Sequence, residues 1–471
     1  MKIKTLIFNI TVLCMVTLGS QANAALIAET YSSPTSGSVD WAAATWSPAV
    51  VGGPNNGGGN TYNATINHTT SDNLILTTSS DITVQGLALS VSSGSVNFNL
   101  GGNFTLSSGS GLISNIANST GSASNLVINL NGHTMDFSTN STYSHVGYDA
   151  TNTNYTINSS TAGGIFKIGN PQSYVAPSFV FGNNVTFQFA ASTSPYIYTY
   201  NETFAANSTL QIVSAASGAQ WAPMIGAGPN TIGGNVIIGD GTTTNNIELY
   251  ASSLSAVYLN RLATINGNFT LTANSNITMG DTLSSSTGIV GMKVGGDFTD
   301  NNTATGTYNG ILPRYAGPVN TVIYLNGGAG PGNEHSLTIN RTLAASSLGN
   351  VTTFQVGDGT TAGNIKLGHN LNTAGTFTVL KGSRLNLGNY TLTTGGNQAA
   401  TSGADVGWAV AQNSITIQAG VGGVNPTLAY TFGNAGTGLL NSTAGTVSLN
   451  TFNLELNYDA SGWTTGNILL V

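Results

Sequence analysis

The stretch ATINGNFTLTANSNITMG, Ala263 to Gly280, decides the fold because apolar and polar residues alternate in it. Phe269 and Leu271 stand two apart, as do Ile277 and Met279, and small and polar residues separate the two pairs. Side chains two apart project from the same face of a strand. The stretch therefore predicts two short strands joined by a turn.

The phrase Gly-x-Phe/Tyr-Thr-Leu/Val recurs along the chain, whereas no segment keeps a helical period for three turns. Its four copies and one partial copy are centred on Phe104, Phe269, Phe377, Tyr390 and Phe298. Short internal repeats predict a solenoid with about 20–25 residues per coil. Stacked coils bury one continuous core and allow Asn, Ser and Thr side chains to form ladders. We predict an all-β fold, a right-handed parallel β-helix with an N-terminal cap. A row of β-sandwich domains is the alternative.

The chain divides by composition into four parts. A positive start, an apolar run and small residues before Ala25 are typical of a secretory signal peptide. The segment VDWAAATWSP that follows contains two tryptophans, which we expect to cover the open end of the core. The predicted parts are a signal peptide at 1–24, a cap at 25–60, solenoid coils at 61–450 and terminal strands at 451–471.

The scarcity of charge excludes several classes of function. Only 6% of the 471 residues are charged and the net charge is −7, whereas ordinary domains carry about 25% charged residues. A nucleic-acid partner requires a basic surface, which is absent from this composition. The only cysteine, Cys14, falls in the signal peptide, so we expect no disulfide. No later apolar run is long enough for a transmembrane helix.

The phrase Gly-Asp-Gly-Thr-Thr occurs twice, around Asp240 and Asp358. A phosphate-binding loop would require a following lysine, which neither copy has. Calcium-binding repeats require an Asp in every coil, and these copies lie far apart. Asp-Gly favours a tight turn because Gly adopts positive φ without steric cost. We interpret both copies as turns.

Candidate catalytic groups are few. The closest acid pair, Asp297 and Asp300, we interpret as part of a solvated turn. The segment with Glu334, His335 and Arg341 we interpret as a surface loop. No two histidines have the spacing of a local metal site, and no Gly-x-Ser-x-Gly motif occurs. The sequence therefore predicts no catalytic residue, no metal site, no cofactor and no enzyme.

One aromatic segment is distinctive. In PYIYTYNETF, the residues Tyr196, Tyr198 and Tyr200 stand two apart and would share one face of a strand. Three interpretations remain open: packing on the solenoid's own flank, self-association, and sugar binding.

Several segments together resemble a known family. They are the opening tryptophans with NTYNATI, DITVQGLALS from Asp81, the Gly-x-Phe-Thr-Leu coils and LNYDASGWTTGNILLV at the end. These resemble secreted bacterial proteins with autotransporter-associated β-strand repeats. The resemblance implies a parallel β-helix of the cell surface or matrix. We expect one difference from that family, namely the lack of a C-terminal membrane barrel, wall-sorting signal or hydrophobic anchor.

These observations lead to an expectation about function. We expect a secreted bacterial protein without catalytic activity, acting as a structural or adhesive subunit of a surface layer, filament, sheath or extracellular matrix. Scarce charge reduces repulsion between copies, and open strand edges at the coil ends would favour a homopolymer. The alternative is a polysaccharide-binding or polysaccharide-degrading β-helix. Binding to ice or crystal surfaces is a third, weaker possibility.

Overall fold

The computed structural model describes most of the chain after the predicted signal peptide. The described residues are 25–33, 37–57, 60–91, 93–107, 124–138, 153–169, 179–191, 196–198, 202–214, 219–222, 231–251, 260–281, 289–303, 312–313, 320–330, 332–343, 352–373, 377–380, 383–387, 390–394, 415–417, 427–433, 436–437, 439–442, 447–449 and 453–458.

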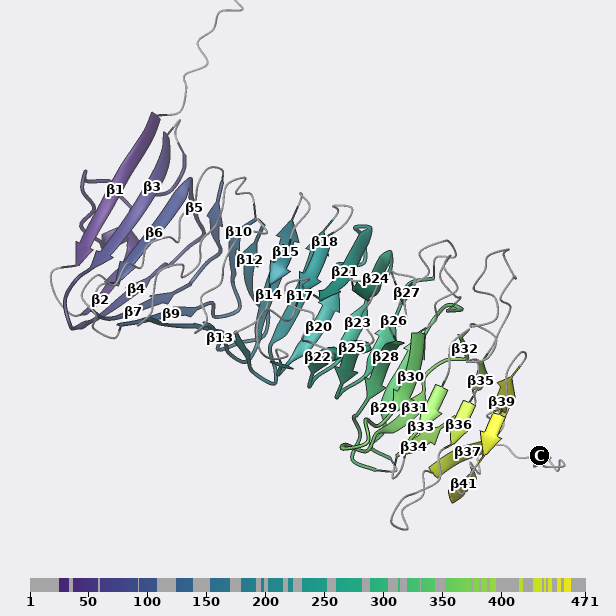
Figure 1. Ribbon diagram of the computed structural model, residues 1–471. Helices are drawn as coiled ribbons and strands as arrows, with labels where there is room; N and C mark the ends of the chain where they lie inside the picture. Colours follow the sequence, from purple (N-terminus) through teal and green to yellow (C-terminus); the bar gives the residue numbers. More distant parts are fainter. Residues whose placement is uncertain are drawn as a thin grey trace, which may run out of the picture.

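The described strands form an elongated, three-sided parallel β-helix (Figure 1). Strands β21 (Asn245–Ala251), β22 (Asn260–Ile265) and β23 (Phe269–Leu271) form three sides of one coil. In the next coil β24 (Ser275–Asp281), β25 (Ile289–Val294) and β26 (Phe298–Asp300) pair with them one for one. Among the described strands, every pair is parallel except the β37–β38 hairpin. The predicted all-β fold and its parallel β-helix are confirmed.

The three sides are called the long sheet, the second side and the third side. The long sheet comprises β5 (Ile82–Val84), β8 (Phe104–Leu106), β10 (Thr134–Phe137), β12 (Gly164–Ile168), β14 (Val185–Ala191), β17 (Thr209–Ser214), β20 (Asn235–Ile238), β23, β26 (Phe298–Asp300), β29 (His335–Ile339), β31 (Asn364–Leu367), β34 (Arg384–Asn386), β37 (Thr427–Gly433), β38 (Gly436–Thr437) and β41 (Asn453–Tyr458). The second side comprises two sheets, β2 (Gly37–Asp40), β4 (Asn73–Thr77), β7 (Gly94–Asn99), β9 (Ser124–Asn129), β11 (Thr153–Asn158), β13 (Phe179–Phe181) and β16 (Thr203–Phe204), then β19 (Thr231–Ile232), β22, β25 (Ile289–Val294), β28 (Asn320–Leu325), β30 (Thr352–Val356), β33 (Phe377–Val379), β36 (Ile415–Ile417) and β40 (Val447–Leu449). The third side comprises three sheets, β1 (Ala25–Ser33), β3 (Asn60–His68) and β6 (Gly86–Val91), then β15 (Tyr196–Tyr198), β18 (Ala219–Ala222), β21, β24 (Ser275–Asp281) and β27 (Leu312–Pro313), then β32 (Leu371–Thr373), β35 (Thr391–Thr394) and β39 (Leu439–Ser442).

The core is a column of apolar side chains in register. One row runs along the inner face of the long sheet, and all of its members are buried. It consists of Ile82, Phe104, Met135, Phe166, Phe187, Leu210, Val236, Phe269, Phe298, Leu337 and Leu367. Each coil contributes only one strand to each side. Burial of these side chains therefore requires that the coils above and below pack against them.

The coils are longer and less regular than the sequence repeat indicated. Side chains stacked on neighbouring coils are 23 residues apart for Gln188 and Gln211, but 30 for Asn99 and Asn129. The separation reaches 39 residues for Asn301 and Asn340. The expectation of about 20–25 residues per coil holds where Gln188 stacks on Gln211, but was wrong for the longer coils. The strands stay short, so the additional residues lie in the connections between them.

The two tryptophans of the first coil cover the N-terminal end of the core. Trp41 begins a short 3-10 helix, η1 (Trp41–Ala43), and is 1% exposed. Its ring centroid lies 6.0 Å from that of Phe98 and 5.5 Å from that of Phe104, and Trp46 packs against it at 4.7 Å. Each indole N–H donates to a backbone carbonyl, at 3.0 Å, so burial leaves neither donor unpaired.

Strand edges at this end are partly occupied by the chain itself. In β1, Thr30 exchanges two backbone hydrogen bonds with Ser47, at 3.0 and 2.9 Å. In β5, Thr83 accepts from the backbone N–H of Asn56 at 2.6 Å and donates to the side chain of Asn55 at 2.8 Å. The expectation that coil ends are open templates for pairing was therefore wrong at these positions.

Candidate functional site

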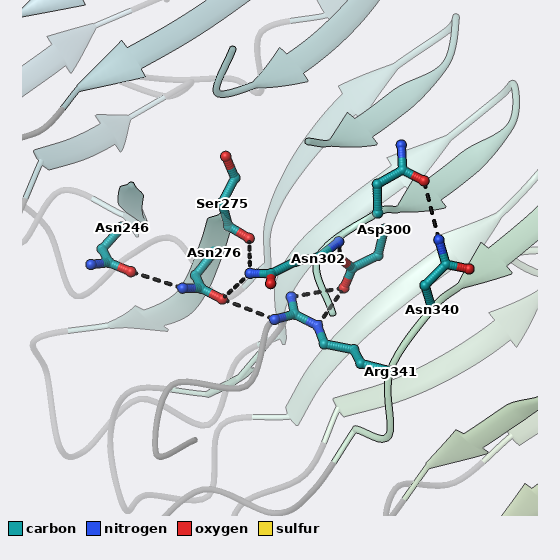
Figure 2. A network of polar contacts seen from close by, with 8 residues as sticks. Asn246, Ser275, Asn276, Asp300, Asn302, Asn340 and Arg341 are labelled. Carbon is teal, nitrogen blue, oxygen red and sulfur yellow. Dashed lines mark hydrogen bonds and ion pairs between the residues drawn. The ribbon is translucent and has the colours of Figure 1, made fainter. Parts of the chain in front are cut away.

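A network of polar side chains lies at the corner where the long sheet leads into the third side (Figure 2), and four of its members are buried: Ser275, Asp300, Asn302 and Arg341. We call it the corner network. It joins strands β21, β24 and β26 to the segment after β29, and thus links successive coils. Its members are Asn246, Ser275, Asn276, Asp300, Asn302 and Arg341.

An ion pair forms the centre of the corner network. Arg341 Nε donates to Asp300 Oδ2 at 2.8 Å, and Arg341 Nη2 lies 2.8 Å from the same oxygen. The exposed fractions of the two side chains are 2% for Arg341 and 0% for Asp300. Burial raises the pKa of Asp300, and the adjacent guanidinium partly offsets that rise.

Asp300 occupies a core position. It pairs in register with Leu271 on one side and Ile339 on the other, and both are buried. The interpretation of Asp297 and Asp300 as a solvated turn was therefore wrong for Asp300. The alternation Phe298, Thr299, Asp300 could have predicted the inward position, because the first and third residues share a face.

Asparagine amides complete the corner network. Asn302 donates from its backbone N–H to Asp300 Oδ1 at 3.0 Å. Its Nδ2 donates to the carbonyl of Ser275 at 2.7 Å and to Asn276 Oδ1 at 3.0 Å. Asn276 Oδ1 also accepts from Arg341 Nη1 at 2.9 Å. Both carboxylate oxygens of Asp300 are therefore engaged, and the network cross-links coils.

A second cluster lies where β26 and β29 begin. Asp297 Oδ1 accepts from the backbone N–H of Ser336 at 2.8 Å and lies 3.0 Å from His335 Nδ1. Glu334 pairs with Arg384, which lies two strands further along the long sheet. Burial raises the pKa of Glu334, but its hydrogen bonds lower the value by more. The interpretation of this segment as a surface loop was wrong, because His335 begins a strand and Glu334 is held between coils.

The two Gly-Asp-Gly-Thr-Thr phrases are turns, as predicted. Asp240 Oδ1 accepts the N–H groups of Thr242 and Thr243 at 2.9 and 2.7 Å. Asp358 Oδ1 accepts the corresponding N–H groups of Thr360 and Thr361 at the same distances.

The glycines that flank each aspartate have φ between +81° and +90°, which glycine adopts without strain. The two turns occupy different corners. One lies between the long sheet and the third side, and the other between the second side and the long sheet.

The second turn has an additional role. Asp358 Oδ2 accepts from Lys293 Nζ at 2.6 Å and from Asn326 Nδ2 at 3.0 Å. These three residues come from three successive coils of the second side, because β25, β28 and β30 are neighbours in one sheet.

The repeated Gly-Asn-Phe-Thr-Leu phrase contains a feature that the sequence analysis missed. Asn235 Oδ1 accepts the backbone N–H of Asn268 at 2.9 Å, and Asn268 Oδ1 accepts that of Asp297 at 2.8 Å. Asp297 continues the series to Ser336. We call this series the Asx staircase. Each side-chain oxygen caps the equivalent backbone N–H one coil further on.

The glycine before each staircase residue is explained by close approach of the neighbouring coil. A Cβ atom on Gly296 would lie 2.3 Å from Asn268 Oδ1 and 2.7 Å from the carbonyl carbon of Gly267. The recurring Gly-Asn/Asp pair was the signal that could have revealed the staircase.

The tyrosine segment is only partly described. Tyr196 and Tyr198 lie at the two ends of β15, which pairs with β18, while Tyr200 lies outside the described residues. Between them, Ile197 is in register with Trp221, whose side chain is buried. The shared face predicted for Tyr196, Tyr198 and Tyr200 remains a prediction.

Comparison with known proteins assigns no family to the chain. Among the described residues, no group of three His, Cys, Asp or Glu side chains could hold a metal ion, and no helix is long and apolar enough to cross a membrane. The chain matches no protein-family model, no curated protein and no solved structure. The resemblance to autotransporter-associated repeats therefore remains a prediction.

Proposed function

We propose that this protein is a secreted bacterial structural or adhesive rod without catalytic activity, which associates with copies of itself in a surface layer, filament, sheath or matrix. The observation that carries the proposal is the direction of its ion pairs. All four ion pairs of Lys or Arg with Asp or Glu between described residues join different coils, as does the His335–Asp297 contact. Two of them, Lys293–Asp358 and Glu334–Arg384, reach past the neighbouring coil to the next one.

Such pairs resist separation of the coils along the axis. Amide ladders act in the same direction, as in Asn99–Asn129 at 2.6 Å and Gln188–Gln211 at 2.9 Å. The carboxylates of Asp297, Asp300 and Asp358 are held by these contacts. Because the charged groups hold successive coils together, the arrangement fits a load-bearing rod better than an enzyme that turns over a substrate.

The outer face of the long sheet supports lateral self-association. Ile237, Thr270, Thr299 and Thr338 stand in register on four successive coils, and each is partly exposed. An uncharged row of this kind imposes little electrostatic repulsion on a second copy. Because edges at the N-terminal end are partly occupied, we expect contact between sides of rods more than between ends.

Electron microscopy and light scattering of the secreted protein test the proposal. We expect ordered filaments or sheets, and we expect Thr299→Arg to disperse them by placing charge in the neutral row. The matched control is Thr156→Arg on the second side, which should still assemble. Dispersed single rods at high concentration would count against self-association. Binding in a glycan screen by such rods would instead favour the polysaccharide-binding alternative.

A further inference from the structure

On successive coils of the second side, two side chains contact the same carboxylate oxygen of a third. Lys293 Nζ lies 2.6 Å from Asp358 Oδ2, and Asn326 Nδ2 lies 3.0 Å from the same oxygen. Lys293 is on β25, and Asn326 directly follows β28, the neighbouring strand. The amine nitrogen and the amide nitrogen therefore cannot be farther apart than these two distances placed end to end.

We propose that Lys293 and Asn326 become joined by an intramolecular amide bond between Lys293 Nζ and Asn326 Cγ, with Asp358 as the acid–base group. The bond would tie two neighbouring coils covalently. The inference does not depend on the proposed function, since a cross-linked rod need not assemble with other rods.

The reaction balances without any other reactant. Asp358 Oδ2 takes a proton from Lys293 Nζ, and the neutral amine attacks Asn326 Cγ. The bond from Nζ to Cγ forms as the bond from Cγ to Nδ2 breaks, and the proton on Oδ2 passes to the departing Nδ2. Ammonia leaves, and the second proton lost by Nζ goes with it to water as ammonium. No electron transfer is involved.

The position of Asp358 suits both proton transfers. A single oxygen contacts the nitrogen that loses a proton and the nitrogen that gains one, so the carboxylate need not move between the two steps. Holding an amine beside an amide converts a very slow bimolecular exchange into an intramolecular one. Neither the nucleophile nor the leaving group has to be brought in from solution.

The surroundings restrict the access of water. The exposed fraction of the Asp358 side chain is 6%, and Asn326 Oδ1 is buried without a hydrogen-bond partner among the described residues. Lys293 Nζ lies 5.8 Å from the ring centroid of Tyr324, which is itself 9% exposed. The carboxylate and the amide oxygen are therefore shielded from water, whereas the Lys293 side chain is 33% exposed.

The resting state is the ion pair. Burial raises the pKa of Asp358, but hydrogen bonds from Lys293, from the backbone N–H groups of Thr361 and Thr360 and from Asn326 lower it by more. The neutral pair that reacts is therefore a minor form, and the reaction is slow. It has to occur only once in each molecule, and the released ammonia is lost by dilution.

Peptide mapping by mass spectrometry tests the proposal on the protein as secreted. We expect the peptide with Lys293 to be joined to the peptide with Asn326, with a combined mass lower by one ammonia molecule. Lys293→Arg retains the cation but not the amine and should yield two separate peptides. Asp358→Asn keeps the side-chain oxygen that caps the turn and should also leave them separate.

The control is Lys167→Arg, which alters another lysine–aspartate pair between neighbouring coils, Lys167–Asp136 at 3.1 Å. It should leave the joined peptides intact. Two unjoined peptides of full mass in the unmodified protein would overturn the proposal. Loss of ammonia confined to the Asn326 peptide would overturn it too, since that result indicates ring closure onto the backbone nitrogen of Gly327.

Discussion

Arg341 lies on the coil after Asp300, 41 residues further along the chain, and its Nε donates to the Asp300 carboxylate at 2.8 Å. Both side chains are almost completely removed from solvent. A buried ion pair contributes little compared with a well-packed apolar pair, but loss of one partner leaves an uncompensated charge. The pair therefore matters most for keeping these two coils in their present register.

Arg341→Ala should destabilise the protein by about 3–5 kcal/mol, because Asp300 would remain buried without its cation. The matched control is Lys167→Ala, which breaks a partly exposed ion pair and should cost about 0–1 kcal/mol. The midpoints of urea unfolding give both values. Equal, small losses in the two variants would show that Asp300 gains access to water when Arg341 is removed.

The Asx staircase makes a prediction about side-chain chemistry. Asn268→Ala removes the acceptor for the backbone N–H of Asp297 and should cost about 1–3 kcal/mol if that donor is left unsatisfied. Asn268→Asp keeps the oxygen, as Asp297 does in the next coil, and should restore most of the loss. Thermal unfolding of both variants measures the difference. No rescue by Asp would mean that the amide N–H₂ is the important group.

Much of the fold followed from the alternation of residues, and the reason is local. Phe269 and Leu271 fill the core because strand geometry places every second side chain inward. The connections were harder to predict, since nothing in the phrase around Phe298 shows that 39 residues separate Asn301 from its stacked partner Asn340. The number of residues in a coil depends on the connections between its strands, and the sequences of these connections do not repeat.

Most of the polar contacts could not be predicted from the sequence, because they join residues that lie far apart in it. Asp300 and Arg341 belong to different phrases, and local composition favoured a turn for one and a loop for the other. The Gly-Asp-Gly-Thr-Thr turns were predictable because Asp240 binds its own neighbours. To predict the contact between Lys293, Asn326 and Asp358, one would have needed to know the order of three coils.

Gly296→Ala should destabilise the protein by about 1–3 kcal/mol, the usual cost of overpacking. The added Cβ would lie 2.3 Å from Asn268 Oδ1, and the neighbouring backbone leaves little room for adjustment. Gly57→Ala is the control, because nothing lies within 4 Å of the equivalent Cβ there. Denaturant unfolding compares the two, and an equal effect would contradict close approach of the coils at Gly296.

The Asp240 turn predicts a dependence on pH. The N–H of Thr243 is the largest cause that lowers the pKa of Asp240, from 3.8 to about 2. A lowered pKa means that the unfolded chain binds the proton more readily, so the carboxylate stabilises the fold above pH 3.8 and this contribution is lost as the pH falls through about 2.

Asp240→Asn keeps Oδ1 but removes the charge, so we expect it to be less stable than the unmodified protein at neutral pH. The difference should shrink as the pH falls below 3.8 and disappear near 2. Unfolding midpoints measured across that range check the expectation, and a constant difference would contradict it.

Trp41→Ala tests whether the N-terminal end of the core requires its aromatic cover. Removal of the indole uncovers Phe98 and Phe104 and should cost about 3–5 kcal/mol, as for other buried aromatic side chains. Because the core would then face solvent at the end of the stack, binding of a hydrophobic dye should increase along with the loss of stability. Trp41→Phe keeps an aromatic ring and should recover part of both effects. An unchanged unfolding temperature with no added dye binding would mean that Trp46 alone covers the core.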